Sequence, residues 1–387
     1  MIDSMLLKKL ISIRRAIHQY PELGNNEFRT ASLIEKTLRE FRIPCKRLTR
    51  TGVVGYLQGK IRSTPAKCVA LRADMDALPL TEKGRKPYRS KIPGVMHACG
   101  HDAHVAMLLG AASLLKDREF PGLIKLMFQP NEEGAGGALQ LIDKGVMRSP
   151  KVDAVFGLHV NPRLPVGAIG VKPGPLMASV DKFTLEIIGR GGHAAYPHEG
   201  LDPLPIAGET ITALQTIVSR RTDPVDSAVV TVGTIQGGTR YNILAESVLL
   251  TGTVRTLSEK THRAAPRWIR QIVDGVTKAH GASYRFEYEI LGSVLSNDAD
   301  MAQLAARAGA KVVGPRNVIA LQTASMGGED FAEYLKAAPG CFVYIGTGSA
   351  SKSKLVPWHH PEFDLNETAM PIGAKLLAEM ALDFLKS

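Results

Sequence analysis

The chain reads CVALRADM at residues 68–75, AHVAMLLGAASLLK at 103–116, LIKLMFQ at 123–129, ALQLIDKG at 138–145 and DAVFGLHV at 153–160. The first, third and last of these are apolar runs of strand length, and the other two have the spacing of helices. Strands that alternate with helices are typical of an α/β fold with a largely parallel sheet. We therefore expect such a sheet in this part of the chain.

The pattern changes after this point. Residues 164–179, LPVGAIGVKPGPLMAS, are dense in Gly and Pro and are interpreted as a linker. Six segments follow in the order strand, helix, strand, strand, helix, strand: FTLEIIG, LPIAGETITALQTIVSR, AVVTVGTI, SVLLTGTVRT, THRAAPRWIRQIVDGVTKAHG and YRFEYEI. This is the order of a small split β-α-β domain. The first pattern then resumes with CFVYIGTG and ETAMPIGAKLLAEMALDFLK, so we expect a discontinuous domain, 1–179 and 295–387, with an α+β domain inserted at 180–294.

Composition describes an ordinary globular protein, with 44% hydrophobic and 22% charged residues among 387. Lys and Arg exceed Asp and Glu, 48 to 37, and most of the excess lies before residue 63. No zinc-finger spacing or basic-aromatic motif accompanies this charge, so nucleic acid is not expected as a partner. No apolar run approaches the roughly 18 residues of a membrane span.

The amino terminus and the cysteines favour the cytoplasm. MIDSMLLKKLISIRRAIHQY has neither a secretory hydrophobic region nor a small-residue cleavage site. Its spacing predicts an amphipathic helix whose basic residues, Lys8, Lys9, Arg14 and Arg15, form a solvated face. Four cysteines without a paired CxxC motif fit a reducing compartment. We expect a cytoplasmic protein that does not bind membranes.

Side chains that can bind metal gather at the ends of the predicted strands, where open α/β sheets place their sites. They are Asp74, Asp76, Glu132, Glu133 and His159, and His359 and His360 lie near the carboxyl terminus in VPWHHPEFD. HACGHDAH (97–104) adds five candidate ligands just before a helix. Five such residues in eight positions are hard to explain as core packing, since imidazoles and carboxylates are rarely buried without partners.

A set of thiolate, imidazole and carboxylate ligands suits a borderline-soft divalent ion better than Ca²⁺ or Mg²⁺. Zn²⁺, Mn²⁺, Co²⁺ and Ni²⁺ all remain open. The adjacent carboxylates Glu132 and Glu133 suit a hydrolase, because one can bind metal while the other acts as general base on a water molecule. By itself the pair would be interpreted as charges at the start of a helix. No HExxH motif is present, which excludes a helix-borne zincin site.

A dozen ordered motifs resemble the N-acyl-amino-acid amidohydrolases, which include hippurate hydrolases, aminoacylase-like deacylases and plant auxin-conjugate hydrolases. The motifs run from RADMDALP and HACGHDAH through QPNEEGAGGA, GLHV, GRGGHAAYPH and GTVRT to MGGEDFAEY and HHPEFD. These enzymes form a branch of the dinuclear metallopeptidases. The resemblance implies a mixed-sheet α/β catalytic domain and a satellite domain that mediates dimerisation, in a homodimer or a dimer-based homo-oligomer.

The resemblance also implies roles for individual residues. Glu132 corresponds to the general base, and Asp76 corresponds to an acidic residue that orients the site. Asp74 stands where related carboxypeptidases have a metal-binding His. Two divalent metal ions per subunit are implied, with ligands at Cys99, His101, Glu133, His159 and His359.

The inserted domain holds further candidates. His193 of GRGGHAAYPH corresponds to a His that reaches the partner subunit's site and stabilises an oxyanion, whereas in a monomer it would fix a Gly-rich turn. Asn242 is a second candidate donor. Arg255, Gly327 and Gly328 are candidate grips on a substrate carboxylate, Arg255 because its planar fork pairs bidentately with one. An exposed strand Arg is the competing interpretation.

We therefore expect hydrolysis of the amide bond of N-acyl-L-amino acids by a metal-activated water, with Glu132 as general base. One alternative is a dipeptidase or carboxypeptidase that uses the same site on short peptides. Another is a basic binding protein whose metal site is only structural. Arg240, Ala245–Glu246 and Asn161–Pro162–Arg163 depart from the usual family pattern and leave the substrate open.

Overall fold

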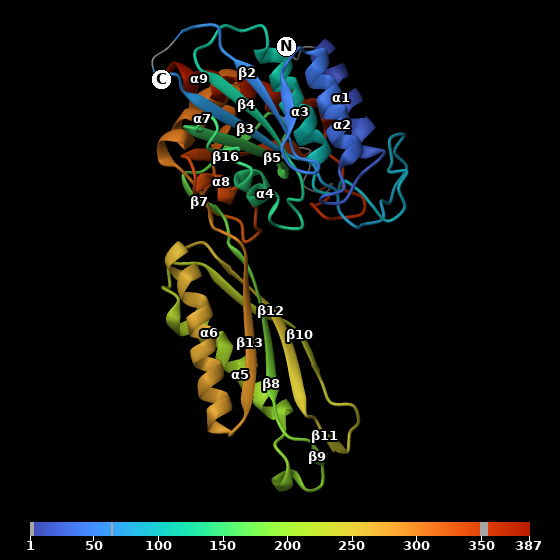
Figure 1. The fold of residues 1–387 in the computed structure, drawn as a ribbon, viewed down its shortest axis with the longest axis vertical. Coiled ribbons are helices and arrows are strands. Elements are labelled where there is room, and N and C mark those ends of the chain that lie inside the picture. Colours follow the sequence, from blue (N-terminus) through green and yellow to red (C-terminus); the bar gives the residue numbers. More distant parts are fainter. Residues whose placement is uncertain (1–3, 63–64, 349–354) are drawn as a thin grey trace. The chain divides into compact units, whose positions relative to one another are not determined.

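The computed structural model describes residues 4–62, 65–348 and 355–387, and its contacts divide the chain into two units (Figure 1). Unit 1 consists of Met1–Gly174, Ser296–Thr323 and Asp330–Ser387. Unit 2 consists of Pro175–Leu295 and Ala324–Glu329. The roles expected for the two predicted domains, catalysis and dimerisation, remain predictions.

An eight-stranded sheet forms the middle of unit 1, in the order β1-β2-β4-β3-β5-β16-β6-β15. The strands are β1 (Cys45–Arg47), β2 (Val53–Gln58), β3 (Cys68–Asp74), β4 (Leu123–Gln129), β5 (Ala154–Pro165), β6 (Ile169–Val171), β15 (Val318–Ala320) and β16 (Gly340–Gly348). β3 pairs in parallel with β4 and with β5, and β5 pairs in parallel with β16, whereas β2 pairs antiparallel with β4. The predicted α/β class with a mixed sheet is confirmed.

Helices cover both faces of this sheet (Figure 1). The face with the main hydrophobic cluster carries α1 (Ser4–His18), α2 (Phe28–Glu40), α3 (His101–Leu115), α7 (Ala299–Val313) and α9 (Met370–Lys386). The other face carries α4 (Gly137–Asp143) and α8 (Ala332–Leu335). Within the described residues, no helix combines the length and the apolar character needed to cross a membrane.

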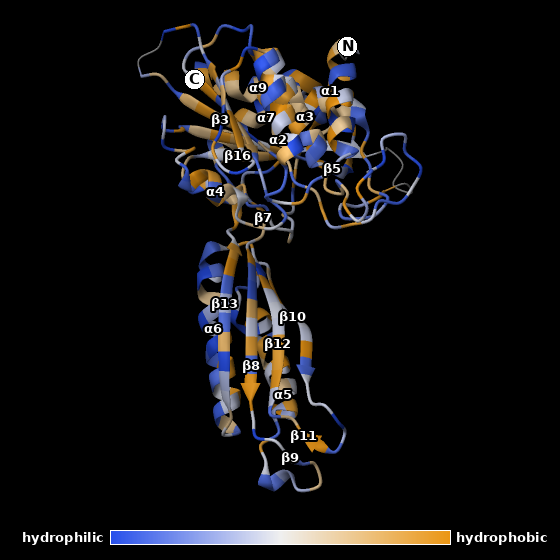
Figure 2. Cartoon of the chain, turned by 45° about the vertical axis from the view of Figure 1, so that its right-hand side comes forward, coloured by the Kyte–Doolittle hydropathy of each residue, from blue (hydrophilic) through white to orange (hydrophobic). Residues whose placement is uncertain are grey.

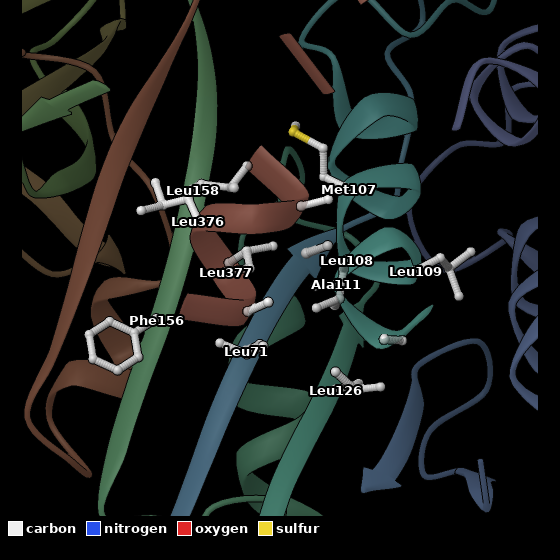
Figure 3. Close-up of a cluster of buried hydrophobic side chains, with 14 of the residues drawn as sticks. Leu71, Met107, Leu108, Leu109, Ala111, Leu126, Phe156, Leu158, Leu376 and Leu377 are labelled. Carbon is white, nitrogen blue, oxygen red and sulfur yellow. The ribbon is translucent and has the colours of Figure 1, made fainter. Parts of the chain in front are cut away.

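Side chains from β3, β4, β5, α3 and α9 form the core of unit 1 (Figure 3). Leu71 and Leu126 lie on the strands, Leu108 lies on α3 and Leu377 on α9, and all four are fully buried. α3 is apolar on nearly every side because it lies between the sheet and the outer helices, which is typical of a buried helix. This packing fixes the start of α3 at the edge of the sheet.

One part of the linker interpretation is wrong. Residues 164–179 contain two strands, β6 (Ile169–Val171) and β7 (Gly174–Met177). β6 lies between β16 and β15, antiparallel to the first and parallel to the second. A three-residue strand obtains its hydrogen bonds from neighbours that are distant in sequence, so the local Gly and Pro content could not reveal it.

Unit 2 contains an antiparallel sheet in the order β10-β12-β8-β13. Its main elements are β8 (Val180–Ile188), β9 (Gly192–His193), α5 (Pro203–Thr216), β10 (Ala228–Gly237), β11 (Ile243–Leu244), β12 (Ser247–Thr256), α6 (Glu259–Ala279) and β13 (Ser283–Gly292). α5 and α6 pack against the sheet around Phe183, Leu185 and Leu250. Hydrophilic and hydrophobic residues alternate along β13, as expected for a strand with one covered face (Figure 2).

The remaining elements are short. They are the strand β14 (Leu295–Asn297), the 3₁₀ turns Pro197–Glu199, Pro315–Asn317 and Glu367–Ala369, and a π-helical turn at Ile217–Arg221.

Candidate metal centre

The candidate ligands of unit 1 meet at one edge of its sheet. Because β3, β4 and β5 are parallel, their carboxyl ends lie at the same edge, and the start of α3 and the segment after β16 reach it too. The side chains brought together are Asp74, Asp76, Cys99, His101, Glu132, Glu133, His159 and His359.

His101 presents one ring nitrogen to the centre of this group. Its Nδ1 lies 3.0 Å from the carbonyl oxygen and 3.2 Å from Oδ1 of Asp76, and because both are acceptors, Nδ1 carries the proton. Nε2 is buried and has no hydrogen-bond partner in the part of the chain that the structure describes. Metal-binding histidines show this arrangement, with one nitrogen held by a carboxylate or carbonyl and the other facing the ion.

His159 is held in the same way. Its Nδ1 donates to the carbonyl of Val160 at 2.8 Å, so Nε2 faces Sγ of Cys99, 3.3 Å away. Trp358 meets the His159 ring edge-on, with centroids 5.3 Å apart. Burial raises the pKa of Cys99, so the side chain is a thiol until a cation lies beside it. Metal binding here would therefore release a proton.

Glu133 and His359 complete the group. His359 Nε2 lies 3.3 Å from Glu133 Oε1, and this carboxylate raises the pKa of His359. The φ of His359 is 61°, and its amide donates to the carbonyl of Ala98 at 2.9 Å, which ties the segment to the HACGHD motif. His360 instead accepts from the amide of Glu362 at the surface.

These residues fit divalent cations. Ligand atoms of Cys99, His101 and His159 lie within 4.8 Å of one another, and so do those of Cys99, Glu133 and His359. A buried polar nitrogen without a hydrogen bond is costly, and a cation bound to Nε2 of His101 would remove that cost. A thiol with imidazoles and carboxylates is the donor set of a borderline-soft divalent ion.

His104 resembles a ligand in the sequence, but both of its nitrogens are occupied. Nε2 accepts the amide N–H of Val160 at 3.0 Å, so Nδ1 carries the proton and donates to Asp74 at 2.6 Å. Burial lowers the pKa of His104, which agrees with a neutral ring. Asp74 also accepts from Arg72 at 2.7 Å. His104 and Asp74 therefore brace β3 against the strand that carries His159.

Asp330 is a buried carboxylate that the sequence analysis did not assign to the site. It accepts from Arg72 at 3.0 Å, from the side-chain amide of Gln129 at 2.7 Å and from the backbone amide of Ala138 at 3.0 Å. Burial raises its pKa to about 6. Asp330 thus joins the ends of β3 and β4 to the start of α4. The signal in the sequence that points to Asp330 is its place in the MGGED motif. Its partner Gln129 lies 201 positions away, so the contact itself leaves no local pattern.

A buried ion network joins α1 to this edge. Arg14 is 1% exposed and donates to Asp102 at 3.1 Å, to Asp364 at 2.6 Å and to Glu367 at 3.0 Å. Burial alone would raise the pKa of Asp102, but Arg14 and His18 hold it far below its usual range. The solvated basic face predicted for this helix is therefore wrong at Arg14. The network fixes α1 to the first turn of α3 and to the segment after His359.

Replacing Arg14 by Met should lower the free energy of unfolding by about 3–5 kcal/mol, because the buried Asp102 would lose the guanidinium and keep only His18 as a partner of opposite charge. The folded-state pKa of Asp102 lies below its unfolded value, so this stabilisation is present at neutral pH and is lost as the pH falls through the folded-state value. Urea unfolding at pH 7 measures the effect. Arg15→Met is the matched control, because Arg15 is 41% exposed and its pair with Glu367 is worth at most about 1 kcal/mol. Equal losses would contradict the buried network.

His193 and Asn242 are neighbours in unit 2. His193 in β9 pairs with Ile243 in β11, and the amide of Ala194 donates to the carbonyl of Asn242 at 3.2 Å. The ring of His193 is exposed, and its Nδ1 accepts from the amide of Ala195 at 3.0 Å. The proton of a neutral His193 therefore lies on Nε2, where it can be donated.

Arg255 and Gly328 form a second group in unit 2. A Cβ atom at Gly328 would lie 3.3 Å from Nη1 of Arg255, and the carbonyl of Gly327 accepts from the amide of Ala178. Arg255 comes directly after Val254 in β12, and Val254 pairs with Asp181 near the start of β8. β9, which carries His193, follows the end of β8. The two groups are therefore separated along nine-residue β8, roughly 26 Å end to end.

Comparisons with known proteins agree with these features. A model described as Peptidase family M20/M25/M40 matches residues 70–383. The chain is 39% identical over 391 residues to the N-acetylcysteine deacetylase of Bacillus subtilis (strain 168), with 100% of both chains covered. It is 38% identical to Thermostable carboxypeptidase 1 of Saccharolobus solfataricus, with 97% of this chain and 95% of that one covered. The solved structure of the Bacillus subtilis YXEP protein, described as a dinuclear metal-binding peptidase from the M20 family, matches with a TM-score of 0.87 and 36% identity over 99% of both chains.

Proposed function

The chain belongs to peptidase family M20/M25/M40, and from this membership we propose that it hydrolyses the amide bond of N-acyl-L-amino acids. The predicted family resemblance and the prediction of a hydrolytic enzyme are confirmed. The interpretation as a basic binding protein with a structural metal site is therefore set aside.

One observation carries the proposal: metal-binding side chains converge on Nε2 of His101, which has no hydrogen-bond partner among the residues that the structure describes. Its Nε2 lies 4.0 Å from Glu132 Oε2 and 3.9 Å from Glu133 Oε1. We propose two divalent ions per subunit, Zn²⁺, Mn²⁺, Co²⁺ or Ni²⁺, with ligands from Cys99, His101, Glu133, His159 and His359. Glu132 is then the carboxylate of the pair that serves as base.

Divalent ions bound here would polarise a substrate carbonyl and lower the pKa of a water molecule. Glu132 accepts the proton of the attacking water and later donates it to the leaving amine, which balances the hydrolysis of an amide to a carboxylic acid and an amine. Asp76 accepts from Nδ1 of His101 and so keeps Nε2 directed at the centre. Cys99 and His159 are buried, so bulk water does not reach the centre from the side on which these two residues lie.

We propose that His193 donates from Nε2 to the oxyanion that forms during attack, and that it does so from a second subunit of a homodimer. An N–H aimed at a developing oxyanion stabilises the transition state by about 3–4 kcal/mol. His193 and Arg255 lie at opposite ends of β8, so one chain cannot bring both to the same small substrate. Tyr241 and Ile243, 90% and 48% exposed, add apolar surface near His193 that suits self-association.

The proposed substrate class is based on the residues that could bind a substrate carboxylate. Asn242 would come with His193 from the second subunit and offer a side-chain amide, whereas Arg255 offers a planar fork with the backbone of Gly327 and Gly328 beside it. An amino-acid carboxylate suits this set. The carboxypeptidase relative favours short peptides as the second candidate class.

A substrate panel separates the two classes. Metal-reconstituted protein should hydrolyse N-acetyl and N-benzoyl amino acids with a kcat/KM about tenfold or more above that for dipeptides of the same carboxyl-terminal residue, because a free amino group would need a partner that an acyl chain does not. Initial rates across the panel measure this. Faster dipeptide hydrolysis would establish the rival, and no hydrolysis of either class would overturn the proposal.

A further inference from the structure

The turn between β4 and α4, residues 130–136, has an unusual backbone. Asn131 and Ala135 have φ angles of 51° and 55°, in the left-handed region that residues other than Gly rarely adopt. Such residues persist where surrounding contacts hold them, and they concentrate at active sites. Because Glu132 and Glu133 lie between these two residues, whatever holds the turn also sets the direction of both glutamates.

One contact to this turn comes from Glu27, the N-cap residue of α2. The side chain of Glu27 is completely buried. Its Oε1 accepts from the amides of Asn25 and Asn131, each at 2.9 Å, and its Oε2 accepts from the hydroxyl of Thr51 at 2.7 Å. A buried carboxylate needs such donors, and one of them is the backbone immediately before Glu132.

The loop before α2 packs directly on the same turn. A Cβ atom at Gly24 would lie 2.0 Å from Oδ1 of Asn131, so any other residue at position 24 would displace the side chain of Asn131. Asn131 also donates from Nδ2 to the carbonyl of Ala135 at 3.1 Å, which closes the turn. Further along, Asp76 accepts the amide of Glu133 at 3.0 Å. Two buried carboxylates therefore hold the turn, one at each side of Glu132.

We infer that Glu27 is a positioning residue whose carboxylate holds the amide of Asn131, so that Glu132 and Glu133 face the metal centre. The inference rests on the proposed function, which makes Glu133 a ligand and Glu132 the base. Glu27 acts through hydrogen bonds to the backbone, and its charge is not required. A glutamine at this position keeps one oxygen for the two backbone amides, and its NH₂ group can donate to Thr51.

Three variants of the full chain distinguish the effect of the side-chain length of Glu27 from the effect of its charge. Glu27→Ala removes both, Glu27→Asp keeps the charge but is one methylene too short, and Glu27→Gln keeps the reach. Glu27→Ala and Glu27→Asp should bind Mn²⁺ about 10–100-fold more weakly, measured by calorimetric titration of metal-free protein. Both should also speed amide hydrogen exchange in residues 130–136 and lower kcat. Glu27→Gln should remain within about threefold of the wild type, because its hydrogen bonds are retained.

Glu22→Ala is the matched control. The side chain of Glu22 also makes three hydrogen bonds, to Arg29 and Thr30 at the start of α2, and none of the three reaches the turn. Its Mn²⁺ affinity should equal that of the wild type. A loss in Glu22→Ala as large as in Glu27→Ala would show a general loss of stability and overturn the inference. If Glu27→Gln binds Mn²⁺ as weakly as Glu27→Asp does, the charge of Glu27 is required, and this result would also overturn the inference.

The inference and the proposed function fail in different ways. If the wild type hydrolyses nothing in the substrate panel, the proposed function fails, while Mn²⁺ affinity and hydrogen exchange still decide the role of Glu27. If the wild type is active and Glu27→Asp matches it in both measurements, the inference alone fails. If Glu27→Ala does not fold, Glu27→Asp carries the test.

Discussion

Glu132→Gln is expected to lower kcat by about 10²–10⁴-fold, the range that a lost general base costs. The amide has nearly the same shape as the carboxylate, but it cannot accept a proton from water or return one to the leaving amine. Because Glu132 is the carboxylate of the pair not assigned as a ligand, Mn²⁺ affinity should change little. Steady-state kinetics on the best N-acyl amino acid and calorimetric Mn²⁺ titration measure the two quantities.

The adjacent glutamate is the control for this prediction. Glu133→Gln removes a proposed ligand, so its first effect should be weaker metal binding, and part of its lost turnover should return as Mn²⁺ is raised. The two variants differ by one position and change the charge equally. If the turnover of Glu132→Gln survives within a few fold, another group is the base, and if that variant loses metal as Glu133→Gln does, the assigned roles are wrong.

Removal of divalent ions by a chelator should abolish activity, and Mn²⁺, Zn²⁺, Co²⁺ or Ni²⁺ should restore it. Stability should follow the same titration, because an ion that binds only the folded state stabilises it by about 2.7 kcal/mol at 100 times its Kd. Within the described ranges, the metal-free protein also leaves the buried Nε2 of His101 without a hydrogen-bond partner. Activity and the midpoint of thermal unfolding, recorded against free metal concentration, check both effects.

His101→Ala controls for effects of the chelator itself. This variant lacks a central ligand, so added metal should raise its unfolding midpoint much less than that of the wild type. A preparation verified to be metal-free that keeps full activity would overturn the mechanism. Restored activity without any rise in the unfolding midpoint would place the ions outside the buried group around His101.

Much of the fold follows from local pattern. β3 and β4 occupy nearly the ranges predicted from their apolar runs, because strand length and burial leave a signal in neighbouring residues. The short strand β6 leaves no such signal, since its hydrogen bonds come from β16 and β15. Local pattern is therefore sufficient for the α/β class but not for the full strand order.

Local sequence pattern likewise predicts some features of the candidate site and not others. HACGHDAH and the Glu132–Glu133 pair are visible in the sequence because their members are adjacent on the chain, and the family resemblance adds roles to them. Adjacency does not say which nitrogen of a ring is available. His101 and His104 are one helical turn apart and chemically identical, and only the contacts with Asp76 and Val160 leave Nε2 of the first ring open and occupy that of the second.

The supporting groups are decided wholly by tertiary structure. The sequence predicts a solvated position for Arg14 and no role for Glu27, and the MGGED motif that contains Asp330 does not identify the partners of that carboxylate. Folding removes each from water, and a buried charge must find partners wherever the packed chain supplies them. Those partners lie up to hundreds of positions away, as Asp364 does from Arg14 and Gln129 does from Asp330. Residue type and local spacing predict which side chains can bind a metal, and three-dimensional packing determines which of them are held in place to do so.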